Sequence, residues 1–281
     1  MIITALVTMK ELLSAADKKK IAVGAFSVGN MEMVMGAVKA SEEKNTPIIL
    51  QIAEKRMKYS PLCLMAPLML AAAKEAKTDI AVHLDHGLTR GCITSALESG
   101  FTSVMLDSSL APFEQNVALT REVVAEAAKY GATTESELGV VGGNEGDSAE
   151  HKITCTSPEA AEEFIARTGI DALAVAIGNA HGNYPVSPEL RFDVLEQINN
   201  RTAVPLVLHG GTGISPEQFR KAISLGIRKI NIATASFDSY ALAAGKFTAQ
   251  CEKPDWFGLS ENCAGAVYEN VIKHIDIFGT M

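Results

Sequence analysis

Short apolar runs alternate with longer amphipathic segments along almost the whole chain. Eight runs of five to seven residues, most of them rich in Val, Ile, Leu and Ala, predict buried β-strands. The predicted strands are Ala22–Val28, Pro47–Ala53, Ile80–Asp85, Ser103–Asp107, Thr133–Gly139, Ala172–Gly178, Pro205–Gly210 and Lys229–Thr234. The segments between them are long enough for helices, among them Met31–Lys44, Phe113–Tyr130, Pro158–Thr168 and Pro216–Leu225.

Strands that alternate with helices predict a parallel sheet with right-handed crossovers. Eight such units in about 250 residues have the size of a (β/α)8 TIM barrel, and a doubly wound open sheet is the alternative. We expect one domain over residues 1–281, with an additional C-terminal helix over Glu261–Ile275 outside the barrel.

The composition is that of a globular protein and argues against nucleic-acid and membrane partners. The chain has 281 residues, of which 47% are hydrophobic and 21% charged, as in ordinary globular proteins. A net charge of −8 without a basic stretch disfavours a nucleic-acid partner. The longest apolar run, Pro61–Ala73, is too short to span a bilayer, so we expect no membrane partner. Five cysteines without a C-x-x-C pair predict a reduced, cytoplasmic protein.

The hydrophobic pattern is lost between Val140 and Ser157, where three glycines and several polar residues follow one another. Long loops inside compact domains are usually functional lids or disordered segments. We interpret this loop as a lid over the active site, because a closing loop can exclude water from the reaction.

Polar residues follow six of the eight predicted strands at their carboxyl ends, which meet at one mouth of a barrel. Among them, His86, His181 and His209 each stand next to a glycine. Three converging imidazoles with an open fourth position suit a catalytic zinc ion. Alternatively, each histidine is merely a polar residue that ends a strand. Of the remaining histidines, His83 is expected in the core or behind a metal ligand, and both His151 and His274 in solvent.

Two further strand ends resemble phosphate sites. The turn 210–213 reads Gly-Gly-Thr-Gly and leads into a helix capped by Ser215, while Asn231–Thr234 leads into a helix that begins near Ala235. Glycine amides and helix N-termini bind phosphate, and the loops after strands seven and eight are a frequent phosphate site in such barrels. The alternative is a tight turn without a ligand.

These motifs together resemble the class II, zinc-dependent ketose-bisphosphate aldolases, which include fructose- and tagatose-bisphosphate aldolases of carbohydrate metabolism. The motifs are His-Leu-Asp-His-Gly, Glu-Leu-Gly-x-x-Gly-Gly-x-Glu, Ala-Ile-Gly-Asn-Ala-His-Gly-x-Tyr, Leu-His-Gly-Gly-Thr-Gly and Lys-Ile-Asn-Ile-Ala-Thr. They occur in the family's order between about Ala22 and Thr234. The resemblance implies a lyase that cleaves a ketose phosphate reversibly to dihydroxyacetone phosphate and an aldehyde.

The resemblance also implies residue roles. His86, His181 and His209 would hold the zinc ion. Asp85 would be the acid/base on the hydroxyl whose carbon–carbon bond is cleaved, and Glu145 in the lid would move the proton at the carbon of the ketone fragment. Zinc stabilises the enediolate charge as a Lewis acid, so that no Schiff-base lysine is needed.

Further roles follow from the same motifs. Asp107 and Glu137 match positions that support the metal site or take a second metal ion. The residues that match the phosphate site are Gly182, Gly210, Gly211, Thr212, Asn231 and Thr234. Backbone carbonyls around residues 181–182 and 210 match a site for a monovalent cation. Family members are homodimers or homotetramers, and we expect one of these states here.

The chain departs from the family pattern at the end of the substrate that lies far from this phosphate. Ala53 replaces a common serine, Phe237 replaces a usual Arg or Lys, and Pro185 replaces a lysine of the phosphate end. These departures predict a substrate without a distal phosphate, such as a ketose 1-phosphate. A basic residue from the C-terminal segment, Lys246 or Lys253, or one from a neighbouring subunit would restore distal binding.

Two other functions are alternatives to an aldolase. A catalytically silent sugar-phosphate-binding barrel would act as a subunit or regulator, and a zinc-dependent epimerase or dehydratase could use a similar barrel. A silent barrel would most easily lose Asp85 or Glu145, and the chain keeps both. The sequence therefore favours aldol chemistry.

Overall fold

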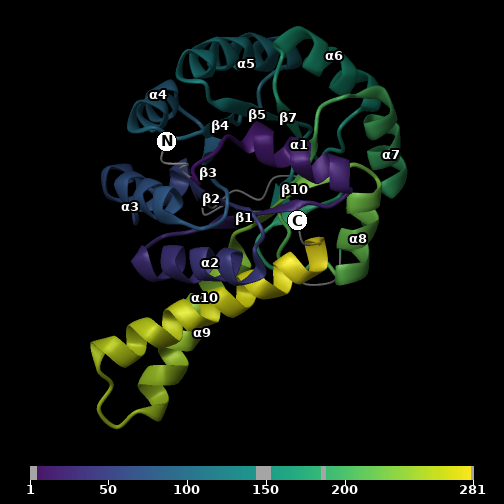
Figure 1. The fold of residues 1–281 in the computed structure, drawn as a ribbon. Helices are drawn as coiled ribbons and strands as arrows, with labels where there is room; N and C mark the ends of the chain where they lie inside the picture. Colours follow the sequence, from purple (N-terminus) through teal and green to yellow (C-terminus); the bar gives the residue numbers. More distant parts are fainter. Residues whose placement is uncertain (1–4, 144–152, 185–187, 280–281) are drawn as a thin grey trace.

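The computed structural model describes residues 5–143, 153–184 and 188–279. Eight parallel strands close into a barrel in the order β1-β10-β9-β7-β5-β4-β3-β2, with helices around it (Figure 1). The barrel strands are β1 (Val23–Ser27), β2 (Ile48–Ala53), β3 (Ile80–Gly87), β4 (Ser103–Leu106), β5 (Thr133–Leu138), β7 (Ala172–Val175), β9 (Leu206–Leu208) and β10 (Ile227–Ile232). The predicted (β/α)8 barrel is confirmed.

Among the described residues, one α-helix precedes the first strand, and the others follow the strands as expected, with an additional helix at the C-terminal end. The α-helices are α1 (Met9–Lys19), α2 (Met31–Lys44), α3 (Leu62–Glu75), α4 (Arg90–Ser99), α5 (Phe113–Ala127), α6 (Pro158–Thr168), α7 (Phe192–Arg201), α8 (Pro216–Ser224), α9 (Thr234–Gln250) and α10 (Trp256–Phe278). Short 3-10 turns η1 (Glu54–Arg56) and η2 (Ala128–Tyr130) follow β2 and α5. Ser157 and Ser215 cap α6 and α8 through their side chains, each with proline at the first helical position.

The C-terminal helix is longer than the predicted Glu261–Ile275 and extends over Trp256–Phe278. It packs on α2 and α9, and together α9 and α10 project beyond the barrel (Figure 1). None of the helices in the described ranges is long and apolar enough to cross a membrane. All five cysteines are free thiols.

Helix α1, which the sequence analysis did not predict, closes the amino-terminal end of the barrel (Figure 1). Thr8 and Glu11 form a capping box at its start. Its buried residues Met9 and Leu13 join an apolar cluster with interior strand residues such as Ile49 and Val207. The floor of the barrel is therefore filled by side chains.

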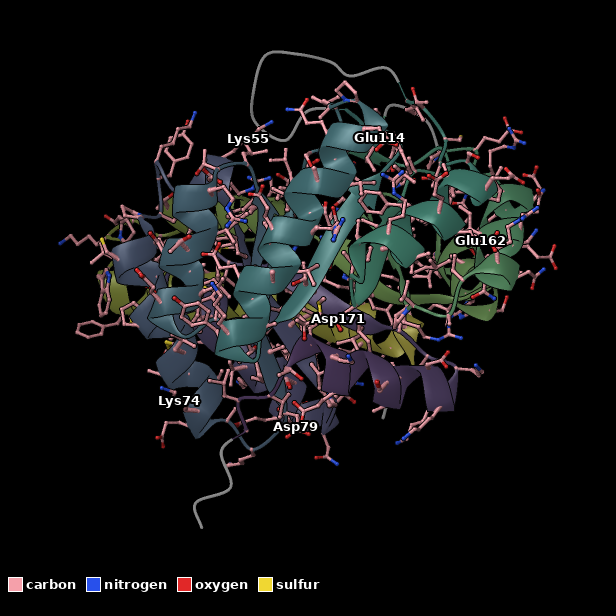
Figure 2. The ribbon with its side chains drawn as sticks, turned by 90° about the horizontal axis from the view of Figure 1, so that it is seen from above. Lys55, Lys74, Asp79, Glu114, Glu162 and Asp171 are labelled. Atoms are coloured by element: carbon pink, nitrogen blue, oxygen red, sulfur yellow. The ribbon has the colours of Figure 1, made fainter. Side chains whose placement is uncertain are left out.

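The interior becomes polar towards the opposite end, because inward positions on the strands change from alanine and valine to charged and amide residues. A short two-stranded sheet of β6 (Gly142–Gly143) and β8 (Ala180–His181) lies at this mouth. Figure 2 shows Lys55, just after β2, and Asp79, just before β3, at opposite ends of the barrel. The predicted site residues lie at the end marked by Lys55.

Candidate active site

The barrel mouth brings the three predicted histidine ligands together. His86 comes from β3, His181 from β8, and His209 directly follows β9. The ring of His86 lies 5.0 Å from that of His181 and 4.6 Å from that of His209, between centroids. One nitrogen from each of the three rings lies within 4.8 Å of the other two, so the three side chains are close enough to hold one metal ion together.

Hydrogen bonds to carboxylates fix the orientation of two of these rings. His86 donates Nδ1–H to Asp107 Oδ2 at 2.8 Å, and His209 donates Nε2–H to Glu135 Oε1 at 2.8 Å. The opposite nitrogens, His86 Nε2 and His209 Nδ1, then face each other at 2.7 Å. Burial lowers the pKa of His209 first of all, which favours its neutral form.

In their neutral forms, with Nδ1–H of His86 and Nε2–H of His209 bound to carboxylates, the two imidazoles would present two lone pairs to the same point. This is unfavourable unless a proton or cation lies between them. A tetrahedral zinc ion would hold two nitrogens roughly 3.3 Å apart, so metal binding needs only a small separation of the two rings. The donor set and its outer carboxylates therefore fit a divalent metal, since carboxylates commonly orient metal-bound histidines.

The backbone of His86 adopts a left-handed conformation, with φ of +40°. Such a conformation costs a non-glycine residue about 1–3 kcal/mol and persists where the surroundings enforce it. The next residue must be small, because a Cβ atom on Gly87 would lie 2.6 Å from the carbonyl oxygen of Met105. The His-Gly pair at this strand end therefore turns the imidazole into the mouth.

A second group of ligand atoms adjoins the first. His86, Asp107 and Glu137 offer atoms within 4.8 Å of one another, as the predicted second metal or supporting role requires. Asp107 also accepts hydrogen bonds from the backbone N–H and hydroxyl of Ser109. Although burial alone would raise the pKa of Asp107, its hydrogen bonds from His86 and Ser109 hold that pKa well below the usual range. Asp107 is therefore an ionised carboxylate.

Asp85, the predicted acid/base, is 2% exposed beside the histidines. Its Oδ2 accepts a hydrogen bond from Gln51 Nε2 and its Oδ1 one from Asn231 Nδ2, both at 3.0 Å. Asp85 Oδ1 also lies 3.9 Å from His86 Nε2. Amides on β2 and β10 therefore aim the carboxylate into the mouth. Gln51 is not among the predicted site residues, although an amide in the otherwise apolar strand β2 is a signal that the sequence contains.

A buried ion pair lies directly beneath the histidines. Lys229 Nζ is 2.9 Å from Glu135 Oε2, and both side chains are fully buried. The contact is a close ion pair rather than an aligned hydrogen bond. Although burial opposes it, the charge of Lys229 and the hydrogen bond from His209 hold the pKa of Glu135 well below the usual range. Glu135 thus links Lys229 to a predicted metal ligand.

The predicted phosphate residues line one small pocket beside the histidines. The pocket is lined by Gly182, Gly210, Gly211, Thr212, Asn231 and Thr234, with Arg56, Asp85, His181 and Ala233. A Cβ atom on Gly210 would lie 2.1 Å from the carbonyl oxygen of Ala180, so only glycine fits there. Tyr184 donates its hydroxyl proton to the Gly210 carbonyl at 2.9 Å, which supports the same turn. Arg56 also lines this pocket and is not among the predicted site residues.

Of the two remaining histidines that the structure describes, one lies where it was predicted and one does not. His83 lies in the core, as expected, with Nδ1 2.6 Å from Ser103 Oγ. The prediction of a solvated His274 is wrong: this side chain is buried against Phe219 and Phe278, and burial lowers its pKa to about 4. The structure does not describe residues 144–152 and 185–187, so the predictions for Glu145, His151 and Pro185 lie outside the described residues.

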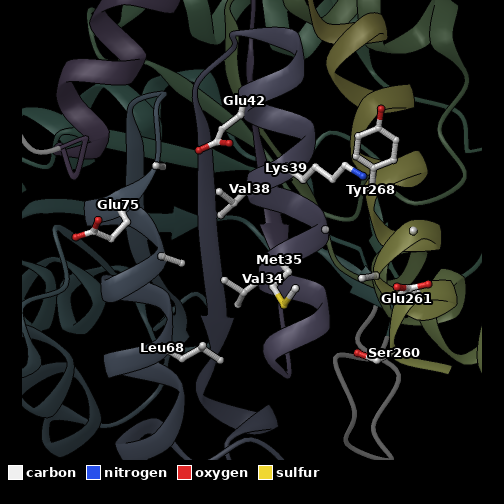
Figure 3. Close-up of a pocket in the computed structure, with 15 residues that line it drawn as sticks. Val34, Met35, Val38, Lys39, Glu42, Leu68, Glu75, Ser260, Glu261 and Tyr268 are labelled. Carbon is white, nitrogen blue, oxygen red and sulfur yellow. The ribbon is translucent and has the colours of Figure 1, made fainter. Parts of the chain in front are cut away.

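A larger groove of about 750 Å³ lies away from the mouth, between α2, α3 and α10 (Figure 3). Lys39, Glu42 and Glu261 line its edges around apolar side chains such as Met35 and Leu68. It contains no converging set of histidines and carboxylates like that of the mouth. We therefore place the chemistry at the mouth, where ligating and acid–base groups meet.

A family model described as fructose-bisphosphate aldolase class-II matches residues 7–281. The chain belongs to the class II fructose-bisphosphate aldolase family. The chain is 41% identical to a fructose-bisphosphate aldolase of Geobacillus stearothermophilus over 248 residues, covering 87% of this chain and 86% of the relative. It is 40% identical to a probable fructose-bisphosphate aldolase of Bacillus subtilis, over 98% of both chains.

Solved structures agree with this membership of the class II aldolases. The crystal structure of the YdjI aldolase from Escherichia coli K12 matches with a TM-score of 0.88, at 34% identity over 98% of both chains. A putative fructose-1,6-biphosphate aldolase from Coccidioides immitis matches with a TM-score of 0.88, at 31% identity over 96% of this chain and 95% of that chain. This family membership makes the protein an aldolase of the lyase class that uses a divalent metal.

Proposed function

We propose that the protein is a zinc-dependent aldolase that reversibly cleaves a ketose phosphate to dihydroxyacetone phosphate and an aldehyde. The observation that supports this most directly is the 2.7 Å approach of His86 Nε2 and His209 Nδ1 beside the buried Asp85. A divalent ion bound by these rings and His181 would supply Lewis-acid stabilisation of the charge that develops when the carbon–carbon bond breaks.

Residues of the chain itself transfer the protons and bind the phosphate. Asp85, oriented by Gln51 and Asn231, accepts the proton of the hydroxyl on the aldehyde side as the bond breaks, and returns it in the condensation direction. The backbone amides of the turn 210–212 and the N-terminus of α9 bind the phosphate of dihydroxyacetone phosphate. Glu145, from the lid, exchanges the proton at the carbon of that fragment.

The proposal is tested by removing and restoring the metal. A chelator should abolish cleavage of ketose phosphates, and one equivalent of zinc should restore it, with metal content measured on the same samples. A screen of ketose monophosphates and bisphosphates, coupled to detection of dihydroxyacetone phosphate, identifies the substrate. Full activity of the stripped protein would contradict the metal assignment, and no release of dihydroxyacetone phosphate from any ketose phosphate would contradict the reaction.

We also propose that the protein is a homodimer or homotetramer. The projecting helices α9 and α10 expose large apolar side chains: Leu242 is 73% exposed, Trp256 60% and Phe257 73%. Exposed apolar groups clustered on one projection are typical of contact surfaces between protein chains. Light scattering during size-exclusion chromatography should give two or four times the 29.8 kDa chain mass, and a monomer at micromolar concentration would contradict this.

A further inference from the structure

Two side chains cross-link the segment that carries His181 to the turn that follows β9. The buried amide of Asn179 donates a hydrogen bond from Nδ2 to the carbonyl oxygen of His209 at 3.0 Å. The hydroxyl of Tyr184 donates a hydrogen bond to the next carbonyl along the chain, that of Gly210, at 2.9 Å. Two consecutive carbonyl groups of the turn are therefore bound by residues on either side of His181.

The hydroxyl of Tyr184 also binds the backbone of its own segment. It accepts a hydrogen bond from the backbone N–H of Ala180 at 2.6 Å. One oxygen atom therefore joins a backbone donor next to His181 to a backbone acceptor next to His209. Burial raises the pKa of Tyr184 to about 12, so the hydroxyl is protonated at neutral pH and makes both hydrogen bonds at the same time.

The two segments are also in direct contact. Gly210 lies so close to the carbonyl group of Ala180 that a Cβ atom on this glycine would overlap with it. The ring of Tyr184 covers Gly213, where a Cβ atom would lie 3.0 Å from a carbon of the ring. Because packing and hydrogen bonds act on the same pair of segments, a shift of the glycine turn displaces the segment that carries His181.

These two segments belong to both halves of the proposed site. His181 and His209 offer nitrogen atoms to one metal ion, and the glycines that follow His209 line the pocket proposed for the phosphate. A bound metal would fix the two segments relative to each other, and a bound phosphate would fix the turn that forms part of the same arrangement. Two ligands that stabilise the same arrangement bind cooperatively, and each raises the affinity for the other by the same factor.

We propose that Tyr184 is a positioning residue that couples metal binding by His181 and His209 to phosphate binding at the turn 210–213. This proposal rests on the aldolase function proposed above. Tyr184 is not among the described residues that line the small pocket, so it acts through the two backbone segments and not on the substrate. Its hydroxyl group is the part that matters, because the ring alone cannot hold the backbone groups of Ala180 and Gly210.

The test measures zinc affinity by competition with a chromophoric chelator, with and without saturating glycerol 3-phosphate. This probe carries a phosphate on a three-carbon chain, as dihydroxyacetone phosphate does, but it has no ketone. We expect the probe to raise the zinc affinity of the wild-type protein about tenfold, a typical coupling between two sites. Tyr184→Phe removes one oxygen atom and both of its hydrogen bonds, and it should reduce this coupling factor to about twofold or less.

Tyr240→Phe is the matched control, because it removes the hydroxyl of another half-buried tyrosine, one on α9 that does not line the pocket. Its coupling factor should equal that of the wild type. The proposal is overturned if the probe leaves the zinc affinity of the wild type unchanged. It is also overturned if Tyr184→Phe lowers the Tm but keeps the wild-type coupling factor, since Tyr184 would then be merely structural. Cleavage of ketose phosphates by the wild type is measured separately, and its absence would refute the proposed function instead.

Discussion

Replacing Lys229 by methionine would remove the positive charge from the buried ion pair beneath the histidines. The change keeps a similar side-chain length but leaves the Glu135 carboxylate with the Nε2–H of His209 as its hydrogen-bond donor among the described residues. Both partners are fully buried at 2.9 Å, and breaking a buried pair on one side costs about 3–5 kcal/mol. For a chain of this size, that loss lowers the Tm by about 10 °C.

The assay is thermal and urea unfolding at pH 7.5, followed by circular dichroism. Arg167→Met is the matched control, because Arg167 pairs with Glu114 and Glu163 at the surface, where its side chain is 37% exposed. Such exposed pairs contribute about 0–1 kcal/mol, so this variant should unfold nearly as the wild type does. A Lys229→Met protein as stable as Arg167→Met would refute the view that the buried charge stabilises the barrel interior.

Three further predictions concern the metal ligands, the lid and the pH dependence. Asp107→Asn should weaken zinc binding about 10- to 100-fold in competition with a chromophoric chelator, because the hydrogen bond that orients His86 is altered; undiminished affinity would contradict this. Glu145→Ala should slow exchange of the dihydroxyacetone phosphate proton with solvent by about 10²–10⁴-fold, and unchanged exchange would remove Glu145 from the mechanism. His274 has a pKa lowered by burial from 6.5 to about 4, so the unfolded chain takes up a proton first as the pH falls. The folded state should therefore lose about 3 kcal/mol between pH 6.5 and pH 4, and His274→Leu should reduce this loss in urea unfolding; the same slope in both proteins would count against it.

The histidines of the mouth could be found from the sequence because each one ends a predicted strand. In a parallel barrel, strand ends converge whatever the exact strand boundaries are, so the positions of His86, His181 and His209 tolerate small errors of register. His274 could have been placed correctly as well, because it shares a stripe of helical spacing with the buried Val267 and Val271.

The positions of other site residues could not be predicted from the sequence, because they depend on strand register or on tertiary contacts. Lys229 stands at the start of the predicted strand, whereas β10 begins at Ile227 and pairs irregularly with β9 between Ile227 and Lys229. The lysine points into the barrel, where it contacts Glu135. A one-residue change of register reverses the face that a strand residue occupies, so the local pattern cannot reveal the partner. Arg56 follows a strand in a short turn, and its place in the pocket depends on Phe237, far away in the sequence.

Because α1 and the interior side chains that it contacts fill the amino-terminal end of the barrel, substrate and products cannot pass through that end and must use the mouth. The substrate binds and both products leave through the mouth, so the two products are released one after the other. In the cleavage direction, the product nearer the mouth leaves before the product that is bound deeper. In the condensation direction, the two substrates bind in the opposite order. Helix α1 therefore affects the order of substrate binding and product release, although it lies at the opposite end of the barrel from the site.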